Sequence, residues 1–246
     1  MITIAVGVGE NKNILEACDI FKTQKPDVNM ELIENDEKLA KSISDKNINA
    51  TIRGSLSASN VLKQLKESYP KISRATYING EGHEFLISSV GIDEGNTLEE
   101  KLNIAIHCIN FMKKLEKTPK IATLSYARPG DYGRSKEINQ SLDDTEKLSK
   151  LIEKHTNQKI ENQCVLIDQA IKNKCNILIA PNGIVGNTIF RTLVLLNSWP
   201  SFGAITFGIN EIYIDTSRDQ STEGYLRSLE LAYKLGSVRD FGDLNF

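Results

Sequence analysis

Residues 176–187 read NILIAPNGIVGN, an apolar run that ends at a proline and continues into a turn with two glycines. Residues 177–180 are short and continuously apolar, which is typical of a strand buried on both faces of a parallel sheet. Gly183 and Gly186 allow a close backbone approach, and Asn187 is a favourable N-cap for the apolar helix expected after it. A helix N-terminus carries partial positive charge, so this turn predicts a binding site for a phosphate or a carboxylate.

A second turn of the same kind follows at residues 215–219, which read DTSRD between a strand-like run and an amphipathic helix. The Arg218 guanidinium can hold a phosphoryl or carboxylate oxygen through two hydrogen bonds, and the Ser217 hydroxyl can donate to the same group. The alternative is purely local: Ser217 or Ser221 caps the helix and Arg218 is a surface charge.

Strand and helix patterns alternate along the rest of the chain, which implies parallel βαβ units. Residues 2–6 form a strand pattern followed by Gly-Val-Gly. We interpret this as a tight turn rather than a dinucleotide site, because Lys12 takes the place of the third glycine. The Asn79-Gly80 pair predicts a hairpin turn between strands at 74–78 and 84–89. Further helices are expected at residues 97–115, 141–155 and 163–173.

The composition is that of an ordinary soluble globular protein, with 40% hydrophobic and 25% charged residues. A formal net charge of -2 provides no basic field for nucleic acid. No apolar run is long enough for a membrane span and Met1 leads directly into a strand pattern, so we expect a cytoplasmic protein without membrane insertion. The four cysteines show no metal-site spacing, which favours reduced core thiols and no metal.

Four motifs, in this order, resemble segments of the phosphate acetyl/butyryl transferase family. Arg53-Gly54-Ser55 falls where that family has a Gly-Ala turn, and residues 96–100 resemble its Pro-Thr-x-Glu-Glu helix start. Residues 120–126 with the following Gly130 resemble its Pro-x-Val-Ala-x-Leu-Ser-Tyr/Phe-Ser segment. The C-terminal signature is matched by Pro181, Gly186-Asn187, Gly203, Gly208 and Ser217-Arg218. Within the family, the chain most resembles a shortened branch of methanogens, methanogenesis marker protein 4 or MtxX, whose members are named as methyltransferases.

The resemblance implies a two-domain α/β/α fold with mostly parallel sheets, similar to isocitrate and isopropylmalate dehydrogenases. The first domain would contain both chain ends, residues 1–75 and 206–246, and the second would contain residues 76–205. The family also forms homodimers, and we carry that expectation over.

The function implied by the resemblance is acyl transfer between phosphate and a thiol such as coenzyme A. Arg218 would hold the phosphate, Ser217 would donate to the carbonyl oxygen or to the leaving thiolate, and Glu223 would act as the base. The substrate-binding residues would be Lys63, Ser125, Arg128, Gly130, Asn182, Gly186, Asn187 and Gly208. We expect a small phosphorylated or acyl substrate, with coenzyme A as a candidate, and no tightly bound cofactor.

The chain also departs from the family pattern. The family has an upstream arginine that contacts the substrate, and no residue of this chain corresponds to it. Lys63 stands where the family has an arginine, so the charge is kept but the planar guanidinium is lost. Asp93-Glu94-Gly95 stands where the family has an Asp-Cys pair. These differences predict an altered substrate or a lost activity. Two alternatives therefore stay open: a methyltransferase or methyltransferase-associated protein of methanogenesis, and a non-catalytic ligand-sensing or assembly protein. The sequence has neither a Gly-x-Gly-x-Gly loop for an adenosyl cofactor nor an Asp-x-His-x-x-Gly motif for a corrinoid.

Overall fold

The computed structural model describes residues 1–237, which divide into two compact units. The first unit contains Met1–Ile72 and the chain from Ser201 onward, and the second contains Ser73–Pro200. Residues 238–246, which the sequence analysis placed in the first domain, lie outside the described residues.

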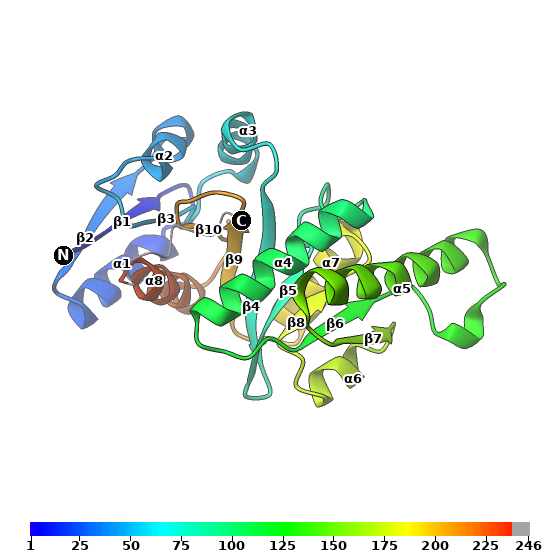
Figure 1. Cartoon of the computed structure of the whole chain (residues 1–246). Helices are drawn as coiled ribbons and strands as arrows, with labels where there is room; N and C mark the ends of the chain where they lie inside the picture. The colour runs from blue at the N-terminus through cyan, green and yellow to red at the C-terminus, as the bar shows by residue number, and fades with distance from the viewer. Residues whose placement is uncertain (238–246) are drawn as a thin grey trace. The chain divides into compact units, whose positions relative to one another are not determined.

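Five described strands form the sheet of the first unit, in the order β2-β1-β3-β10-β9 (Figure 1). They are β1 (Ile2–Gly7), β2 (Val28–Ile33), β3 (Ala50–Ile52), β9 (Ser201–Phe207) and β10 (Tyr213–Asp215). β2, β1, β3 and β10 run parallel, and β9 is antiparallel to β10. The four parallel strands therefore end at one edge of the sheet, where the loops that follow them meet.

Helices cover both faces of this sheet (Figure 1). α1 (Asn13–Gln24) and α8 (Thr222–Gly236) pack beside each other on one face, while α2 (Asp36–Ile43) and α3 (Ala58–Ser68) pack together on the other. Leu39 of α2, Val61 of α3 and Tyr213 of β10 belong to one fully buried cluster. Burial of each such side chain stabilises the fold by about 1.5–3 kcal/mol, which holds α2 and α3 over the strands.

The sheet of the second unit has the order β4-β5-β8-β6-β7. Its strands are β4 (Ser73–Gly80), β5 (His83–Ser88), β6 (Ile121–Leu124), β7 (Ile160–Cys164) and β8 (Ile177–Ile179). β4 is antiparallel to β5, and β5, β8, β6 and β7 are parallel. The helical segments are α4 (Leu98–Lys114), η1 (Pro129–Asp131), α5 (Lys136–Thr156), α6 (Ile167–Lys172), α7 (Gly183–Phe190) and the π-helix η2 (Arg191–Leu196). The predicted α/β fold with mostly parallel strands is confirmed.

The sequence predictions for the β4–β5 turn and for the start of α6 are wrong. The hairpin turn is formed by Glu81 and Gly82, with φ values of +53° and +71°, and Asn79-Gly80 belongs to β4. Gly80 is needed there for packing, because a Cβ on it would lie 2.2 Å from the Trp199 ring. The helix expected at 163–173 begins only at Ile167, since Gln163 and Cys164 belong to β7.

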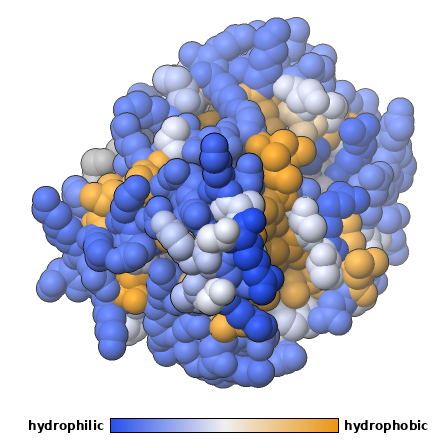
Figure 2. Space-filling view, turned by 90° about the vertical axis from the view of Figure 1, so that its right-hand side faces the viewer, coloured by the Kyte–Doolittle hydropathy of each residue, from blue (hydrophilic) through white to orange (hydrophobic). Residues whose placement is uncertain are grey.

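The surface view in Figure 2 shows mostly hydrophilic residues, with apolar side chains exposed between them. In the second unit, the segment of α7 and η2 exposes three large apolar side chains: Ile184, Leu195 and Leu196. The four cysteines are free and buried, as predicted. Over residues 1–237, no helix combines the length and the apolar character that a membrane crossing requires.

Candidate functional site

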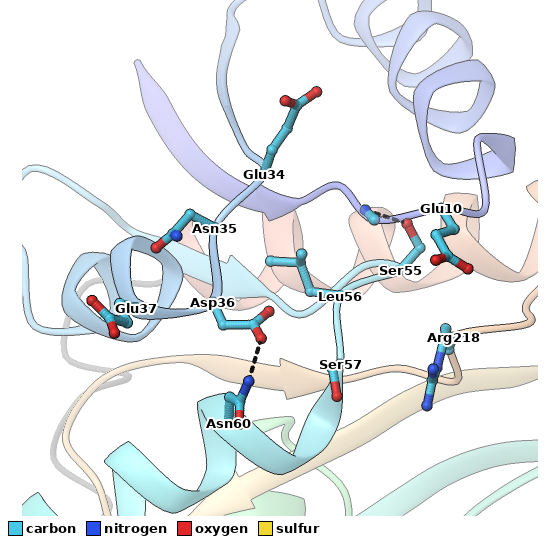
Figure 3. A pocket seen from close by; sticks show the side chains of 11 residues that line it. Glu10, Glu34, Asn35, Asp36, Glu37, Ser55, Leu56, Ser57, Asn60 and Arg218 are labelled. Carbon is cyan, nitrogen blue, oxygen red and sulfur yellow. Dashed lines mark hydrogen bonds between the residues drawn. The ribbon is translucent and has the colours of Figure 1, made fainter.

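A pocket of about 410 Å³ lies at the carboxyl edge of the parallel strands of the first unit (Figure 3). Its lining comes from the loops after β1, β2, β3 and β10 and from the first turns of α2 and α3. The lining residues are Gly9, Glu10, Glu34, Asn35, Asp36, Glu37, Ser55, Leu56, Ser57, Asn60 and Arg218. Loops that are far apart in the sequence thus build one concave site at the edge where open α/β sheets bind ligands.

Arg53, which is only 6% exposed, joins two of these loops. Its guanidinium donates to the Asp215 carboxylate and to the carbonyl oxygens of Leu56 and Thr216. Burial acts to lower the pKa of Arg53, but the Asp215 carboxylate counteracts it and the pKa is raised above its ordinary value. The Thr216 hydroxyl adds a hydrogen bond of 2.7 Å to the carbonyl of Gly54. The β3 and β10 loops are therefore held together from both sides.

Gly54 lets the β1 and β3 loops approach closely. Its φ is +59°, and a Cβ there would lie 1.8 Å from the carbonyl oxygen of Gly7. The next residue, Ser55, is 2% exposed and its Oγ accepts the Gly9 N–H at 2.8 Å. Among residues 1–237, no acceptor is found for the hydroxyl proton of Ser55. This buried hydroxyl lines the pocket and can still donate a hydrogen bond to a ligand.

Arg218 has a fixed backbone and an unengaged side chain. Its carbonyl oxygen accepts hydrogen bonds from Asn11 Nδ2 at 3.1 Å and from the Tyr225 hydroxyl at 2.7 Å. Burial raises the pKa of Tyr225 to about 12, so the hydroxyl remains a donor at neutral pH. The guanidinium forms no hydrogen bond or ion pair with any residue that the structure describes, and it lines the pocket. It is therefore available to a ligand.

Four carboxylates share the pocket with this one guanidinium. Asp36 and Glu37 stand in the first turn of α2, where they complement the partial positive charge of the helix N-terminus. Asp36 also accepts a hydrogen bond of 2.9 Å from Asn60. Glu10 and Glu34 lie outside helices. Figure 3 shows Glu10 and Arg218 on one side of the pocket and Asp36 and Glu37 on the opposite side.

Of the site residues predicted in this unit, Arg218 lines the pocket. Ser217 lies next to it, and its carbonyl accepts a hydrogen bond of 3.1 Å from Tyr225. Glu223 is exposed in the first turn of α8, where its own backbone N–H and the Ser221 hydroxyl lower its pKa. Ser221 caps this helix, so the cap alternative is correct for Ser221.

The two remaining residues predicted in the first unit lie outside the pocket lining. Lys63 is exposed on α3. Gly208 forms a bend after β9 with a φ of +81°, and a Cβ on it would lie 2.9 Å from the carbonyl oxygen of Lys71.

In the second unit, α7 begins at Gly183 and its N-cap is Asn182, so the prediction that Asn187 caps the helix is wrong. The Asn182 side chain accepts the Val185 N–H at 3.0 Å and donates to the Tyr126 hydroxyl at 2.6 Å. The Gly186 N–H donates to the Asn182 carbonyl at 3.0 Å. The backbone of Gly186 is thus engaged within the helix itself.

Tight packing explains the two glycines of this turn. A Cβ on Gly183 would lie 1.6 Å from the carbonyl oxygen of Gly91, and one on Gly186 would lie 1.8 Å from that of Ser89. Asn187, one residue further on, donates from its side chain to the Val90 carbonyl at 3.0 Å. The glycines therefore let α7 lie directly on the loop after β5.

In the predicted loop after β6, the Ser125 hydroxyl and the Arg128 backbone N–H are engaged locally. The buried Ser125 hydroxyl donates to the carbonyl of Ala127 at 2.9 Å. Arg128 is exposed, and its backbone N–H donates to Asp131 at 3.0 Å. Gly130 is exposed, and a Cβ there would meet nothing within 4 Å.

The residues that sequence reasoning missed include Glu10, Glu34, Ser55 and the buried Arg53. Each of them follows a strand of the parallel sheet within three residues. The rule that ligands bind at the carboxyl ends of parallel strands could have pointed to them. Because we interpreted Gly-Val-Gly only as a tight turn, we did not predict a binding site at this edge.

Two curated relatives resemble the chain over most of its length. An uncharacterized methyltransferase of Methanocaldococcus jannaschii is 33% identical over 251 aligned residues, which cover 98% of this chain and 100% of the relative. A protein of Methanosarcina barkeri named "Putative methyltransferase mtx subunit X" is 36% identical over 196 residues, covering 77% of this chain and 71% of its own length. No family model matches the chain.

The fold is similar to that of a solved enzyme structure. A branched-chain phosphotransacylase from Enterococcus faecalis superposes with a TM-score of 0.71 at 20% identity, over 97% of this chain and 100% of that one. The chain thus has a phosphotransacylase fold, and by sequence it belongs to the family of proteins named methyltransferase mtx subunit X.

Proposed function

We propose that this protein is a transferase that binds its substrate through a phosphate or carboxylate group at Arg218. The observation that carries the proposal is the state of Arg218, whose backbone is held by Asn11 and Tyr225 while its guanidinium faces the pocket without a described partner. A guanidinium can bind an oxyanion through two parallel, charge-assisted hydrogen bonds. A fixed backbone lowers the ordering cost of that contact.

The reaction that we propose first is acyl transfer between phosphate and a thiol. A thiolate attacks the carbonyl carbon of an acyl phosphate and a C–S bond forms. The bond between that carbon and the bridging oxygen breaks, and phosphate leaves with the bonding electrons. Arg218 would stabilise the leaving phosphate, and the spare proton of Ser55 or the hydroxyl of Ser217 would donate to the carbonyl oxygen as charge develops there. Glu10, beside Arg218 in Figure 3, would take the thiol proton, a role that the family resemblance implied for Glu223.

Methyl transfer is the second candidate, and the names of the relatives favour it. Arg218 would then hold an acidic group of the methyl donor or acceptor. The two reactions differ in their products: an acyl transferase forms a thioester and releases inorganic phosphate, whereas a methyltransferase adds one methyl group to the acceptor.

A thermal-shift comparison tests the site before any assay of turnover. A ligand that binds only the native state raises its melting temperature. We expect acetyl phosphate and inorganic phosphate to stabilise the wild type and the control Arg134→Ala, but not Arg218→Ala. Arg134 is a suitable control because it is exposed in the other unit and pairs with Asp131. Equal responses of Arg218→Ala and wild type would refute the site.

Turnover then distinguishes the reactions. Formation of a thioester from acetyl phosphate and coenzyme A by the wild type, and its loss in Arg218→Ala, would support acyl transfer. If phosphate binds through Arg218 without any thioester formation from a panel of thiols, methyl transfer becomes the first candidate.

A further inference from the structure

The loop after β1 contacts two residues that the proposed site would use to bind its ligand. The Gly9 N–H donates to the Ser55 hydroxyl oxygen at 2.8 Å, and Asn11 Nδ2 donates to the Arg218 carbonyl at 3.1 Å. Figure 3 shows Ser55, Glu10 and Arg218 together on one side of the pocket. One short loop therefore connects two pocket residues that lie far apart in the sequence.

Both glycines of the Gly-Val-Gly motif are needed for this loop to lie where it does. A Cβ on Gly7 would lie 2.1 Å from the carbonyl oxygen of Arg53, and one on Gly9 would lie 2.3 Å from that of Ser55. Residues without a side chain let the loop after β1 lie directly against the backbone that follows β3. The motif therefore brings this loop onto Ser55.

Asn11 is the link between the loop and the turn that carries Arg218. Besides its bond to Arg218, Nδ2 donates to the Gln220 carbonyl at 3.0 Å, so one amide group holds two carbonyls of the turn. Its Oδ1 accepts the Asn13 N–H at 3.1 Å, which fixes the orientation of the amide. Asn11 lies outside the pocket lining. It can therefore act on a ligand only through the residues that it holds.

A second anchor of the turn has a different reach. The Tyr225 hydroxyl donates to the carbonyls of Ser217 and Arg218 at 3.1 and 2.7 Å. Tyr225 belongs to α8, the helix that follows the turn directly, so it shapes the turn locally. The bond from Asn11 comes from a loop 207 positions earlier in the chain. It therefore fixes the place of Arg218 relative to Ser55.

We propose that Asn11 is a positioning residue of the anion site, which holds Arg218 in the register with Ser55 that lets both bond to one acyl phosphate. The inference rests on the proposed function and names what keeps its binding groups in place. A fixed register lowers the ordering cost of binding. Loss of the Asn11 amide should therefore weaken binding although the groups that would contact the ligand all remain.

Titration calorimetry with acetyl phosphate tests the proposal, at a temperature where circular dichroism shows every variant to be folded. Asn11→Ala should lower the affinity about two- to tenfold, the effect of one lost hydrogen bond. The matched control Asn13→Ala loses a 3.2 Å bond to the Gln220 carbonyl and leaves the bond to Arg218 intact, so it should keep the wild-type affinity. Asn11→Gln keeps the amide donor and should bind more tightly than Asn11→Ala.

The outcomes separate this inference from the proposed function. Equal affinities of Asn11→Ala and the wild type, with binding lost in Arg218→Ala, would overturn the positioning role and leave the Arg218 site standing. A loss that Asn13→Ala shares, or that Asn11→Gln does not reduce, would also overturn it, because the effect would then not depend on the bond to Arg218. No binding by the wild type, or equal binding by Arg218→Ala, would overturn both.

Discussion

Arg53 offers the sharpest test of how the pocket is held together. Replacing it by methionine keeps the aliphatic length but removes the donor to Asp215 and to the carbonyls of Leu56 and Thr216. The ion-paired side chains of Arg53 and Asp215 are 7% and 11% exposed, so water cannot fully replace the lost contacts. Removing one partner of a buried ion pair typically costs about 3–5 kcal/mol.

The expected loss in Arg53→Met is therefore about 3 kcal/mol in the free energy of unfolding. For a chain of this size, that corresponds to a fall of roughly 6–12 °C in melting temperature. Urea denaturation followed by circular dichroism measures the free energy. Because the β3 and β10 loops carry Ser55 and Arg218, phosphate binding should weaken in the same variant.

Two further variants separate the ion pair from simple packing. Arg53→Lys keeps the charge but not the three-way fork, so its stability should lie between those of the wild type and Arg53→Met. Arg53→Met/Asp215→Leu removes both charges, so no unpaired charge stays buried. This double variant should be more stable than the sum of the two single losses predicts. A loss below about 1 kcal/mol in Arg53→Met, or strict additivity in the double variant, would refute the reasoning.

The other predictions concern single positions. Gly54→Ala should cost more than 2 kcal/mol in urea denaturation, because φ is +59° and the Cβ would strike Gly7, whereas Gly130→Ala in open space should change stability by less than about 0.5 kcal/mol. Asn182→Ala should lower stability by about 1 kcal/mol through loss of the α7 cap, and Asn182→Ser should restore most of it; equal losses in both would contradict the capping role. Burial lowers the pKa of Lys101 below its ordinary value of 10.5, so the unfolded chain binds more protons and stability should rise with pH as the folded-state pKa is passed. Lys101→Met should remove this rise from alkaline unfolding curves, and an unchanged pH dependence would contradict it.

Several features of this protein were determined by the sequence alone. The apolar residues 177–180 predicted a fully buried strand, and β8 (Ile177–Ile179) is one. The helix start expected at residues 96–100 is present, since α4 begins at Leu98 and Thr97 and Glu100 form its capping box. These signals are local, because a strand or a helix start depends on residues within a few positions of each other.

The position of helix α7 was decided by tertiary packing. From the sequence, Asn187 was the predicted cap. Asn182 caps the helix instead because Gly183 and Gly186 must lie against the carbonyls of Gly91 and Ser89, which only the paired strands β5 and β8 bring close.

The pocket was likewise decided only by the tertiary structure. The acids of residues 10–37 could be counted in the sequence, but nothing local placed Glu10 and Glu34 in the lining of one pocket with Ser55 and Arg218. The parallel pairing of β1 with β2 and β3, and of β3 with β10, brings these strand ends to one edge. Strand order depends on contacts between residues more than 150 positions apart, which periodicity and turn chemistry do not report.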